Sequence, residues 1–239
     1  MHNDSHQEEK LLREYTALAA TYDQRWSAYL DASLSMTLET VAESPAERIL
    51  DVACGTGLLL ESLAERPDRP ELFGVDRVPA MLETARHRLG QRATLLEGTA
   101  ETLPFEDAAF QLVISTNALH YFEDAGAALH EIRRVMSPSG SLVITDWCRD
   151  YFWMKLLNRV LPMTRHAHVH TFSTCELEHS LSHAGFEIIG KSRKKIDWFW
   201  GLMTIHAIPV GAKAGSCKNG VRLHFSLCKC RQLAANIEK

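Results

Sequence analysis

Glycines and acids follow short apolar stretches of this chain in a repeated pattern. The loop Asp51 to Gly57 follows one such stretch, Asp76 closes the next, and Thr99-Ala100-Glu101 follows a third. Glycine lets the backbone approach a ligand closely, and the free N–H groups of a following helix can bind a carboxylate. An acid at a strand end can accept hydrogen bonds from both hydroxyls of a ribose. These segments together predict a site for a nucleoside-containing ligand.

The glycine loop alone allows other interpretations, because a tight turn or a dinucleotide site would also use it. The dinucleotide fingerprint G-x-G-x-x-G starting at Gly55 requires glycine at position 60, where Leu60 stands. If the loop formed only a tight turn, Asp76, nineteen residues after Gly57, would have no role. The loop and Asp76 therefore indicate a polar group smaller than pyrophosphate, such as the amino acid end of S-adenosylmethionine.

The elements that position these residues are strands alternating with helices. Continuous apolar centres in the strands indicate a parallel sheet covered by helices on both faces. Ligands bind such sheets at the carboxyl ends of the strands, where the acids and glycines lie. Strands are expected at 48–52, 71–76, 93–97, 111–116 and 141–147, with helices at 58–66, 79–89 and 124–136 and a turn at 137–140.

The remaining segments complete the predicted organisation. Residues 1–30 are expected to form an N-terminal cap helix, and residues 31–210 the main domain, with a lid-like insertion near 150–173. Within the main domain, Thr174 is the expected cap of a helix at 175–184. Strands at 186–191 and 196–210 are expected to close the sheet as an antiparallel pair.

Composition restricts the class of protein. Hydrophobic residues make up 46% of the 239 residues and charged residues 23%, as is usual for a globular protein. No apolar run reaches the roughly 20 residues that span a bilayer. The polar N-terminus argues against a secretory signal, and six irregularly spaced cysteines argue against a disulfide framework. We therefore expect a protein of the reducing cytoplasm.

Charge is distributed unevenly along the chain. From Gly211 onward six basic residues accompany one acid, Glu238, so this segment carries +5; the whole chain carries −4, so the rest carries −9. An acidic body argues against a nucleic-acid partner, because phosphate binding needs a basic face. Residues 211–239 are interpreted as a basic C-terminal tail, with contact to an anionic partner or a short docked helix as alternatives.

The motifs as a set resemble the class I S-adenosylmethionine-dependent methyltransferases. Asp51-Val-Ala-Cys-Gly-Thr-Gly57, Gly74-Val-Asp76 and Ala100-Glu-Thr-Leu-Pro-Phe105 are similar to the type 11 branch, which includes the quinone-biosynthesis C-methyltransferases. The similarity extends through 118–122 and 129–140. It implies a Rossmann-like, seven-stranded and mostly parallel sheet with helices on both faces and an antiparallel closing strand.

The resemblance also implies which residues hold S-adenosylmethionine and its product S-adenosylhomocysteine. The loop would contact the methionine moiety and Asp76 the ribose, whereas Tyr22 would close over the cofactor or simply pack in the core. The family usually has an acid where Thr99 stands, so an adenine contact is in doubt there. The predicted cofactor-binding residues are Tyr22, Asp51, Ala53, Cys54, Gly55, Thr56, Gly57, Asp76, Arg77, Met81, Thr99, Ala100, Glu101, Thr116 and Asn117.

The methyl acceptor is expected beyond the fourth and fifth strands. Methyl transfer requires the acceptor in line with the methyl group, and a base only where the acceptor carries a proton. His120 is the candidate base, or alternatively a histidine that packs at the cofactor edge. Trp147, Tyr151 and Trp153 would form an aromatic wall suited to an apolar or planar small molecule, or a lid that packs on the core.

Other ligands and functions are less consistent with the sequence. His166, His168 and His170 would share one face of an extended segment, but they lack a matching cysteine or carboxylate, so we expect no metal site. The expected partner is a small-molecule methyl acceptor, with a monomer or homodimer as the assembly. Two alternatives are a non-catalytic module that binds S-adenosylmethionine and an NAD(P)-dependent oxidoreductase, against which Leu60 counts.

Overall fold

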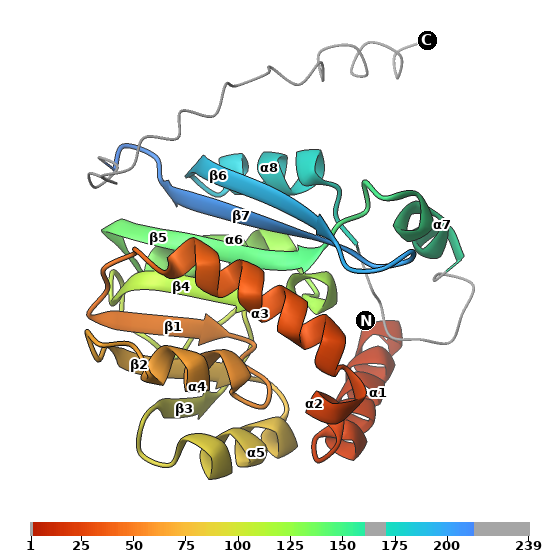
Figure 1. The fold of residues 1–239 in the computed structure, drawn as a ribbon, viewed down its shortest axis with the longest axis horizontal. Helices are drawn as coiled ribbons and strands as arrows, with labels where there is room; N and C mark the ends of the chain where they lie inside the picture. The colour runs from red at the N-terminus through yellow and green to blue at the C-terminus, as the bar shows by residue number, and fades with distance from the viewer. Residues whose placement is uncertain (1, 161–170, 213–239) are drawn as a thin grey trace.

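A seven-stranded sheet runs through the computed structural model, which describes residues 2–160 and 171–212 (Figure 1). The strand order is β3-β2-β1-β4-β5-β7-β6. The pairs from β3 to β5 are parallel, and β7 is antiparallel to both β5 and β6. The predicted fold is therefore confirmed. The strands are β1 Arg48–Val52, β2 Glu71–Asp76, β3 Thr94–Glu97, β4 Phe110–Thr116, β5 Met136–Trp147, β6 Phe186–Lys195 and β7 Gly201–Pro209.

The apolar centres of the inner strands are buried on both faces of the sheet. Ile49 and Leu50 of β1, and Leu112 and Val113 of β4, have no exposed surface. Their side chains point alternately to opposite faces, so consecutive positions at the centre of each strand must be apolar. This requirement explains why continuous apolar runs located the strands in the sequence.

Helices cover both faces (Figure 1). One layer, made by α3, α4 and α5, buries Leu63 and Leu82 against the sheet, and the other, made by α6 and α8, buries Leu129 and Leu181. The helices are α1 His2–Leu18, α2 Tyr22–Arg25, α3 Ser27–Val41, α4 Leu58–Ala64, α5 Pro79–Leu89, α6 Ala125–Val135, α7 Phe152–Val160 and α8 Thr174–His183, with a 3-10 helix η1 at Leu119–Tyr121.

The N-terminal region differs from the prediction of one cap helix over residues 1–30. The chain turns after α1, where the Thr21 N–H bonds to the Leu18 carbonyl, and α2 and α3 follow. α3 then packs along β5, β4 and β7, so its first residues belong to the layer that covers the sheet. The three-region division of the chain remains a prediction.

Other boundaries also differ. β6 extends to Lys195, beyond the predicted end at 191, and β7 begins at Gly201 and not at 196. The expected turn at 137–140 lies inside β5, and Gly140 passes so close to β4 that a Cβ there would lie 3.0 Å from the Gln111 carbonyl oxygen. Ser173, not Thr174, caps α8, and it forms a capping box with Glu176. The segment expected as an irregular lid contains α7.

Some predictions fall on parts of the chain that the structure does not describe. His166, His168 and His170 lie outside the described residues, as does the basic tail from 213 onward. Among residues 2–160 and 171–212, no helix is both long and apolar enough to cross a membrane.

The loop after β1 contains a residue in the left-handed backbone region. Ala53 has φ 61°, which costs a residue with a Cβ about 1–2 kcal/mol, whereas glycine adopts this region freely. Replacing Ala53 with glycine would remove this cost. Glycine also has more freedom in the unfolded chain, which would offset about 0.5–1 kcal/mol of the stabilisation.

We predict that Ala53→Gly raises the free energy of unfolding by about 0.5–1 kcal/mol in urea denaturation. Ala127→Gly, inside α6, is the matched control and should lower the same quantity by about 1 kcal/mol, since helical glycine is disfavoured. A loss of stability in Ala53→Gly would contradict the assigned strain.

Candidate active site

The first of two neighbouring cavities lies at the carboxyl ends of β1, β2 and β4. Of the fifteen predicted cofactor residues all but Gly57 contribute to its wall. Apolar residues, among them Leu30, Leu34 and Leu59, line the rest. The structure thus brings together residues that are up to 95 positions apart, from Tyr22 to Asn117. Their roles in cofactor binding remain predictions.

Asp76 is the carboxylate at the centre of this wall. One of its oxygens, Oδ2, accepts the N–H of Gly55 at 2.8 Å, and the other, Oδ1, accepts the N–H of Val78 at 2.8 Å. Burial raises the pKa of Asp76, and the two N–H groups oppose this rise. Because a carboxylate has about four acceptor sites, each oxygen can still accept a hydroxyl from a ligand.

The two glycines of the loop have different surroundings. Gly55 has φ 53° and open space where a Cβ would lie, consistent with close approach of a ligand. Gly57 has φ 79°, its N–H bonds to the Cys54 carbonyl, and a Cβ would lie 3.1 Å from the Ala85 Cβ. Gly57 therefore serves the turn and the packing of the loop against α5, and it does not face the cavity.

Two further loop residues carry buried titratable groups. Asp51 is 2% exposed, and burial together with the Asp76 carboxylate holds its pKa well above the ordinary range. Burial likewise raises the pKa of the Cys54 thiol. Burial thus disfavours the ionised form of both side chains where they border the cavity.

The segment after β3 forms the opposite wall. Thr99, Ala100 and Glu101 lie there, and Glu101 Oε1 accepts the N–H of Glu123 at 3.1 Å. Arg77 forms an ion pair with Glu123 at 3.1 Å. Glu101 and Arg77 therefore also hold the chain that leads into α6.

The N-terminal helices cover the cavity through aromatic and ionic contacts. Tyr22 lies against Tyr15 with ring centroids 5.8 Å apart, and both line the cavity. Asp23 accepts the Thr56 hydroxyl at 2.7 Å and an Arg88 N–H at 2.5 Å. Arg88 also donates to the Thr56 carbonyl at 2.6 Å. Asp23 and Arg88 thus join α2, the glycine loop and α5.

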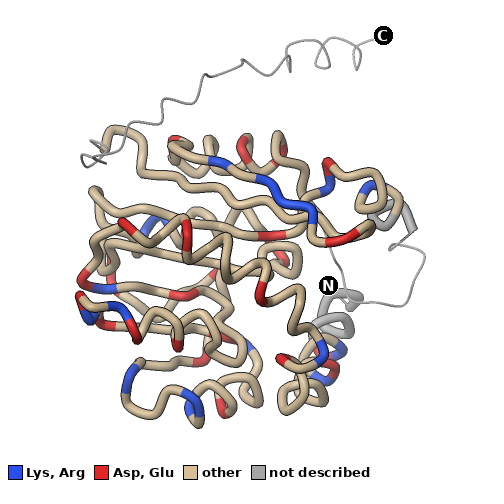
Figure 2. The backbone as a smooth tube through the Cα atoms, viewed as in Figure 1, with Lys and Arg blue, Asp and Glu red and all other residues tan. Residues whose placement is uncertain are grey.

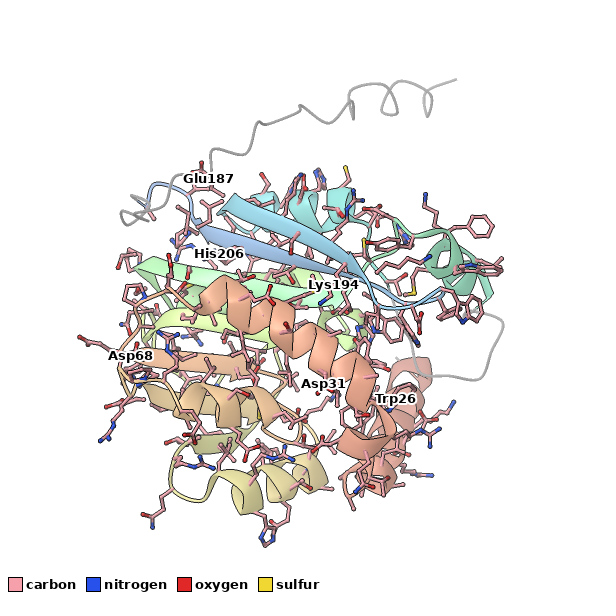
Figure 3. All side chains as sticks on the ribbon, viewed as in Figure 1. Trp26, Asp31, Asp68, Glu187, Lys194 and His206 are labelled. Carbon is pink, nitrogen blue, oxygen red and sulfur yellow. The ribbon has the colours of Figure 1, made fainter. Side chains whose placement is uncertain are left out.

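A second cavity of about 450 Å³ adjoins the first. Tyr15, Tyr22, Asn117 and Tyr121 line both. Trp26, labelled in Figure 3 where α2 meets α3, contributes to the second. Its remaining wall comes from the N-terminal helices, η1, the end of β5 and the residue before β7: Glu14, Ala17, Leu18, Arg25, Tyr29, His120, Trp147 and Trp200.

His120 in η1 is buried and held by a carboxylate of β5. Its Nδ1 lies 2.5 Å from Asp146 Oδ1, and its main-chain N–H bonds to Asp146 Oδ2 at 3.1 Å. The Trp147 ring stacks on the imidazole with centroids 4.1 Å apart. In the tautomer whose Nδ1–H donates to the Asp146 carboxylate, Nε2 is the ring nitrogen left to accept a proton. Nε2 is buried and has no hydrogen-bond partner among the described residues.

A polar chain positions the boundary between the cavities. Trp147 Nε1 donates to the Tyr29 hydroxyl at 2.6 Å, which donates to Asn117 Oδ1 at 2.6 Å. Asn117 Nδ2 donates to Ser33 at 2.7 Å, and its backbone is left-handed with φ 60°. This chain ties α3 to the ends of β4 and β5.

Two predicted acceptor residues lie elsewhere. Tyr151 packs on Gly201, where an added Cβ would clash with its ring, and it lines neither cavity. Trp153 is 39% exposed and contacts Trp198. Only His120 and Trp147 of the four predicted acceptor residues line the second cavity.

Sequence reasoning missed several residues of the site. Asp146, like Asp76, is an acid near the carboxyl end of a predicted strand. The same pattern could therefore have predicted it as a site residue. Tyr29 and Trp200 come from a helix and a hairpin far apart in the sequence, and no local pattern marks them.

Known proteins resemble this chain in both sequence and structure. A family model described as "Methyltransferase domain" matches residues 50–144. Demethylmenaquinone methyltransferase of Deinococcus radiodurans is 39% identical over 112 residues, which are 46% of each chain. Malonyl-[acyl-carrier protein] O-methyltransferase of Halorhodospira halophila is 34% identical over 139 residues, 56% of this chain and 47% of that one. The chain thus spans about half the length of these curated relatives.

Solved structures share the fold. A putative methyltransferase, from its complex with the Trm112 activator of Haloferax volcanii, superposes with a TM-score of 0.68 at 20% identity, covering 82% of this chain and 98% of that one. The matched family model and the shared fold together confirm the resemblance of this domain to class I methyltransferases.

We predict that Asp23 and Arg88 are energetically coupled. In a double-mutant cycle of Asp23→Asn and Arg88→Met, the coupling in the free energy of unfolding should be about 1–2 kcal/mol, as for a charge-assisted hydrogen bond that is mostly buried. The exposed pair Arg13 and Glu9 is the control, with an expected coupling below about 0.5 kcal/mol. Equal coupling in the two pairs would contradict the network.

Proposed function

We propose that this chain, which carries a class I methyltransferase domain of the type 11 branch, transfers a methyl group from S-adenosylmethionine to a small planar organic molecule. The observation that carries the proposal is the adjacency of two cavities with different chemistry. The first presents the Asp76 carboxylate and the glycine loop, and the second is lined by aromatic rings and by His120, whose buried Nε2 has no hydrogen-bond partner among the described residues. Asn117 and three tyrosines stand between them.

The first cavity suits the methyl donor. Asp76 retains acceptor capacity for two ribose hydroxyls, and Gly55 leaves open space beside its backbone. Met81 and Ala100 offer apolar surface for a flat base. When bound, S-adenosylmethionine supplies an electrophilic methyl group on a sulfonium.

The second cavity suits a flat acceptor that carries an ionisable proton. Trp147, Trp200 and Tyr29 provide aromatic surface on which a planar molecule can stack. His120 Nε2 accepts the acceptor's proton, Asp146 stabilises the resulting imidazolium, and Trp147 keeps the ring in place. Asp146 is thus a positioning residue for His120, and neither forms a covalent bond to the acceptor.

The relatives' names indicate two acceptor chemistries, a quinone precursor and a carrier-bound carboxylic acid. Aromatic walls and a basic imidazole favour the first class, an aromatic or quinol-like ring, over an aliphatic carboxylate that has already lost its proton. A cytoplasmic location and a monomer or homodimer complete the proposal.

Two alternative functions fit the two cavities less well. A non-catalytic S-adenosylmethionine-binding module would not need a buried imidazole with an unpartnered Nε2 beside the cofactor cavity. A nicotinamide-dependent oxidoreductase could use the Tyr-x-x-x-Lys spacing of Tyr151 and Lys155, but Tyr151 packs on Gly201 outside both cavities.

We predict that Asp76→Ala weakens S-adenosylhomocysteine binding by about 1–3 kcal/mol in calorimetric titration, because two ribose hydrogen bonds are lost. Asp68→Ala is the control, since Figure 3 shows Asp68 at the opposite edge of the molecule from Trp26. Binding to the unmodified chain should also weaken as pH falls through the raised pKa of Asp76, which removes the carboxylate. Unchanged affinity in Asp76→Ala, or binding of NAD instead, would refute the donor assignment.

We predict that His120→Gln lowers kcat by about 10²–10⁴-fold and leaves S-adenosylhomocysteine affinity unchanged. Asp146→Asn should lower kcat less, by about tenfold or more, since the imidazole remains. Across a series of phenols and quinols, the loss in both variants should shrink as the acceptor becomes more acidic, because an ionised acceptor needs no base. A loss that does not depend on acceptor acidity would show that His120 is structural.

A further inference from the structure

Four large apolar side chains are exposed together at one edge of the molecule. Phe152, Trp153 and Leu156 of α7 are 71%, 39% and 44% exposed, and Trp198 of the hairpin between β6 and β7 is 67% exposed. We call this set the aromatic edge. Six large hydrophobic side chains are exposed among the described residues, so most of them gather here.

The edge is built from direct contacts between α7 and the hairpin. The Trp153 ring lies 5.4 Å from both Phe152 and Trp198, and Trp198 lies 5.6 Å from Phe199. The Ile196 N–H bonds to the Trp200 carbonyl, which closes the hairpin and holds Trp198 outward.

Core packing does not account for these side chains. Met154 on α7 has no exposed surface, so the helix already has a buried side, and the remaining apolar residues of its first turns face outward. A contiguous exposed apolar patch on a folded protein marks an interaction site. The question is which partner fits it.

Positive charge surrounds the aromatic edge. Lys155 lies one turn from Phe152 on α7, and Lys194 and Lys195 end the strand that leads to Trp198. All three are exposed, and within the described residues no ion pair involves them. Figure 2 shows the blue stretch at this end of β6 beside α7, and Figure 3 labels Lys194.

The neighbouring charges are already paired. Arg193 contacts Asp150 at 3.1 Å, and Lys191 contacts Glu178 at 2.6 Å. Asp197 accepts the N–H groups of Phe199 and Trp200 at 2.7 and 2.6 Å, so its carboxylate is used in shaping the hairpin. Asp197 keeps its negative charge, so the three lysines and Asp197 together leave a net charge of +2 to meet an external anion.

We propose that the aromatic edge binds the surface of an anionic lipid bilayer. Tryptophan and phenylalanine favour the headgroup level of a membrane, and lysines near an anionic surface add electrostatic attraction. In this arrangement the rings of α7 and Trp198 enter the headgroup region, and Lys155, Lys194 and Lys195 meet lipid phosphates. The protein lies on the bilayer and does not cross it. This proposal stands apart from the proposed function, because it requires no catalysis.

Co-sedimentation of the full chain with vesicles tests it. We expect at least tenfold stronger binding to vesicles of phosphatidylcholine and phosphatidylglycerol in equal parts than to phosphatidylcholine alone. Binding should fall severalfold in 0.5 M NaCl, since salt screens the lysine attraction. Equal or absent binding to the two vesicle types would overturn the proposal.

Matched variants locate the contact. Trp198→Ala should weaken binding to anionic vesicles at least fivefold, whereas Val210→Ala, 65% exposed near the end of β7, should not change it. Lys195→Glu should weaken binding more than Arg69→Glu, which changes the charge equally at another exposed position. All four variants keep the basic segment from 213 onward. A loss of vesicle binding confined to Trp198→Ala and Lys195→Glu would therefore identify the aromatic edge as the lipid-binding surface. Equal losses in all four, or none, would assign the binding to another surface.

A second copy of the chain is the competing occupant of the edge. Light scattering over a range of concentrations measures self-association. A monomer in both Trp198→Ala and the unmodified chain supports the lipid surface. A dimer that Trp198→Ala dissociates would overturn the proposal in favour of self-association.

Discussion

The Asp76 carboxylate joins the parts of the chain that surround the first cavity. It accepts one N–H from the loop after β1 and one from the turn that leads into α5. Because β1 and β2 are parallel neighbours, with Val52 opposite Val75, the loop must bend back across the strand end to reach this acid. The left-handed backbone of Ala53 and Gly55 accommodates that bend. The loop, α5 and, through Asp23 and Arg88, the N-terminal helices all depend on this geometry.

The two cavities draw on different parts of the chain. The first uses mainly strand ends and loops between residues 51 and 122, all of which the matched family region 50–144 contains. The second adds Tyr29 from α3, Trp147 from the end of β5 and Trp200 from the hairpin, all outside that region. Related proteins that act on different molecules are expected to share one part of the site and to differ in the other.

The sequence allowed much of the fold and of the first cavity to be predicted, because both follow from local patterns. β1, β2 and α5 have the predicted bounds, since buried parallel strands and a proline-started, glycine-ended helix are marked residue by residue. The break between α1 and α2 and the extension of β5 through Gly140 could not be predicted, because tertiary contacts decide them. For the same reason, no local pattern could predict the pairing of His120 with Asp146, which joins η1 to β5 through space.

The five tryptophans are divided between two environments. Trp26, Trp147 and Trp200 line the second cavity, whereas Trp153 and Trp198 stand at the aromatic edge. The intrinsic fluorescence of the protein therefore comes from these two places alone. Quenching by a ligand in the cavity and a spectral shift on contact at the edge are separate optical signals. The native chain thus carries its own probes of both surfaces, without an attached dye.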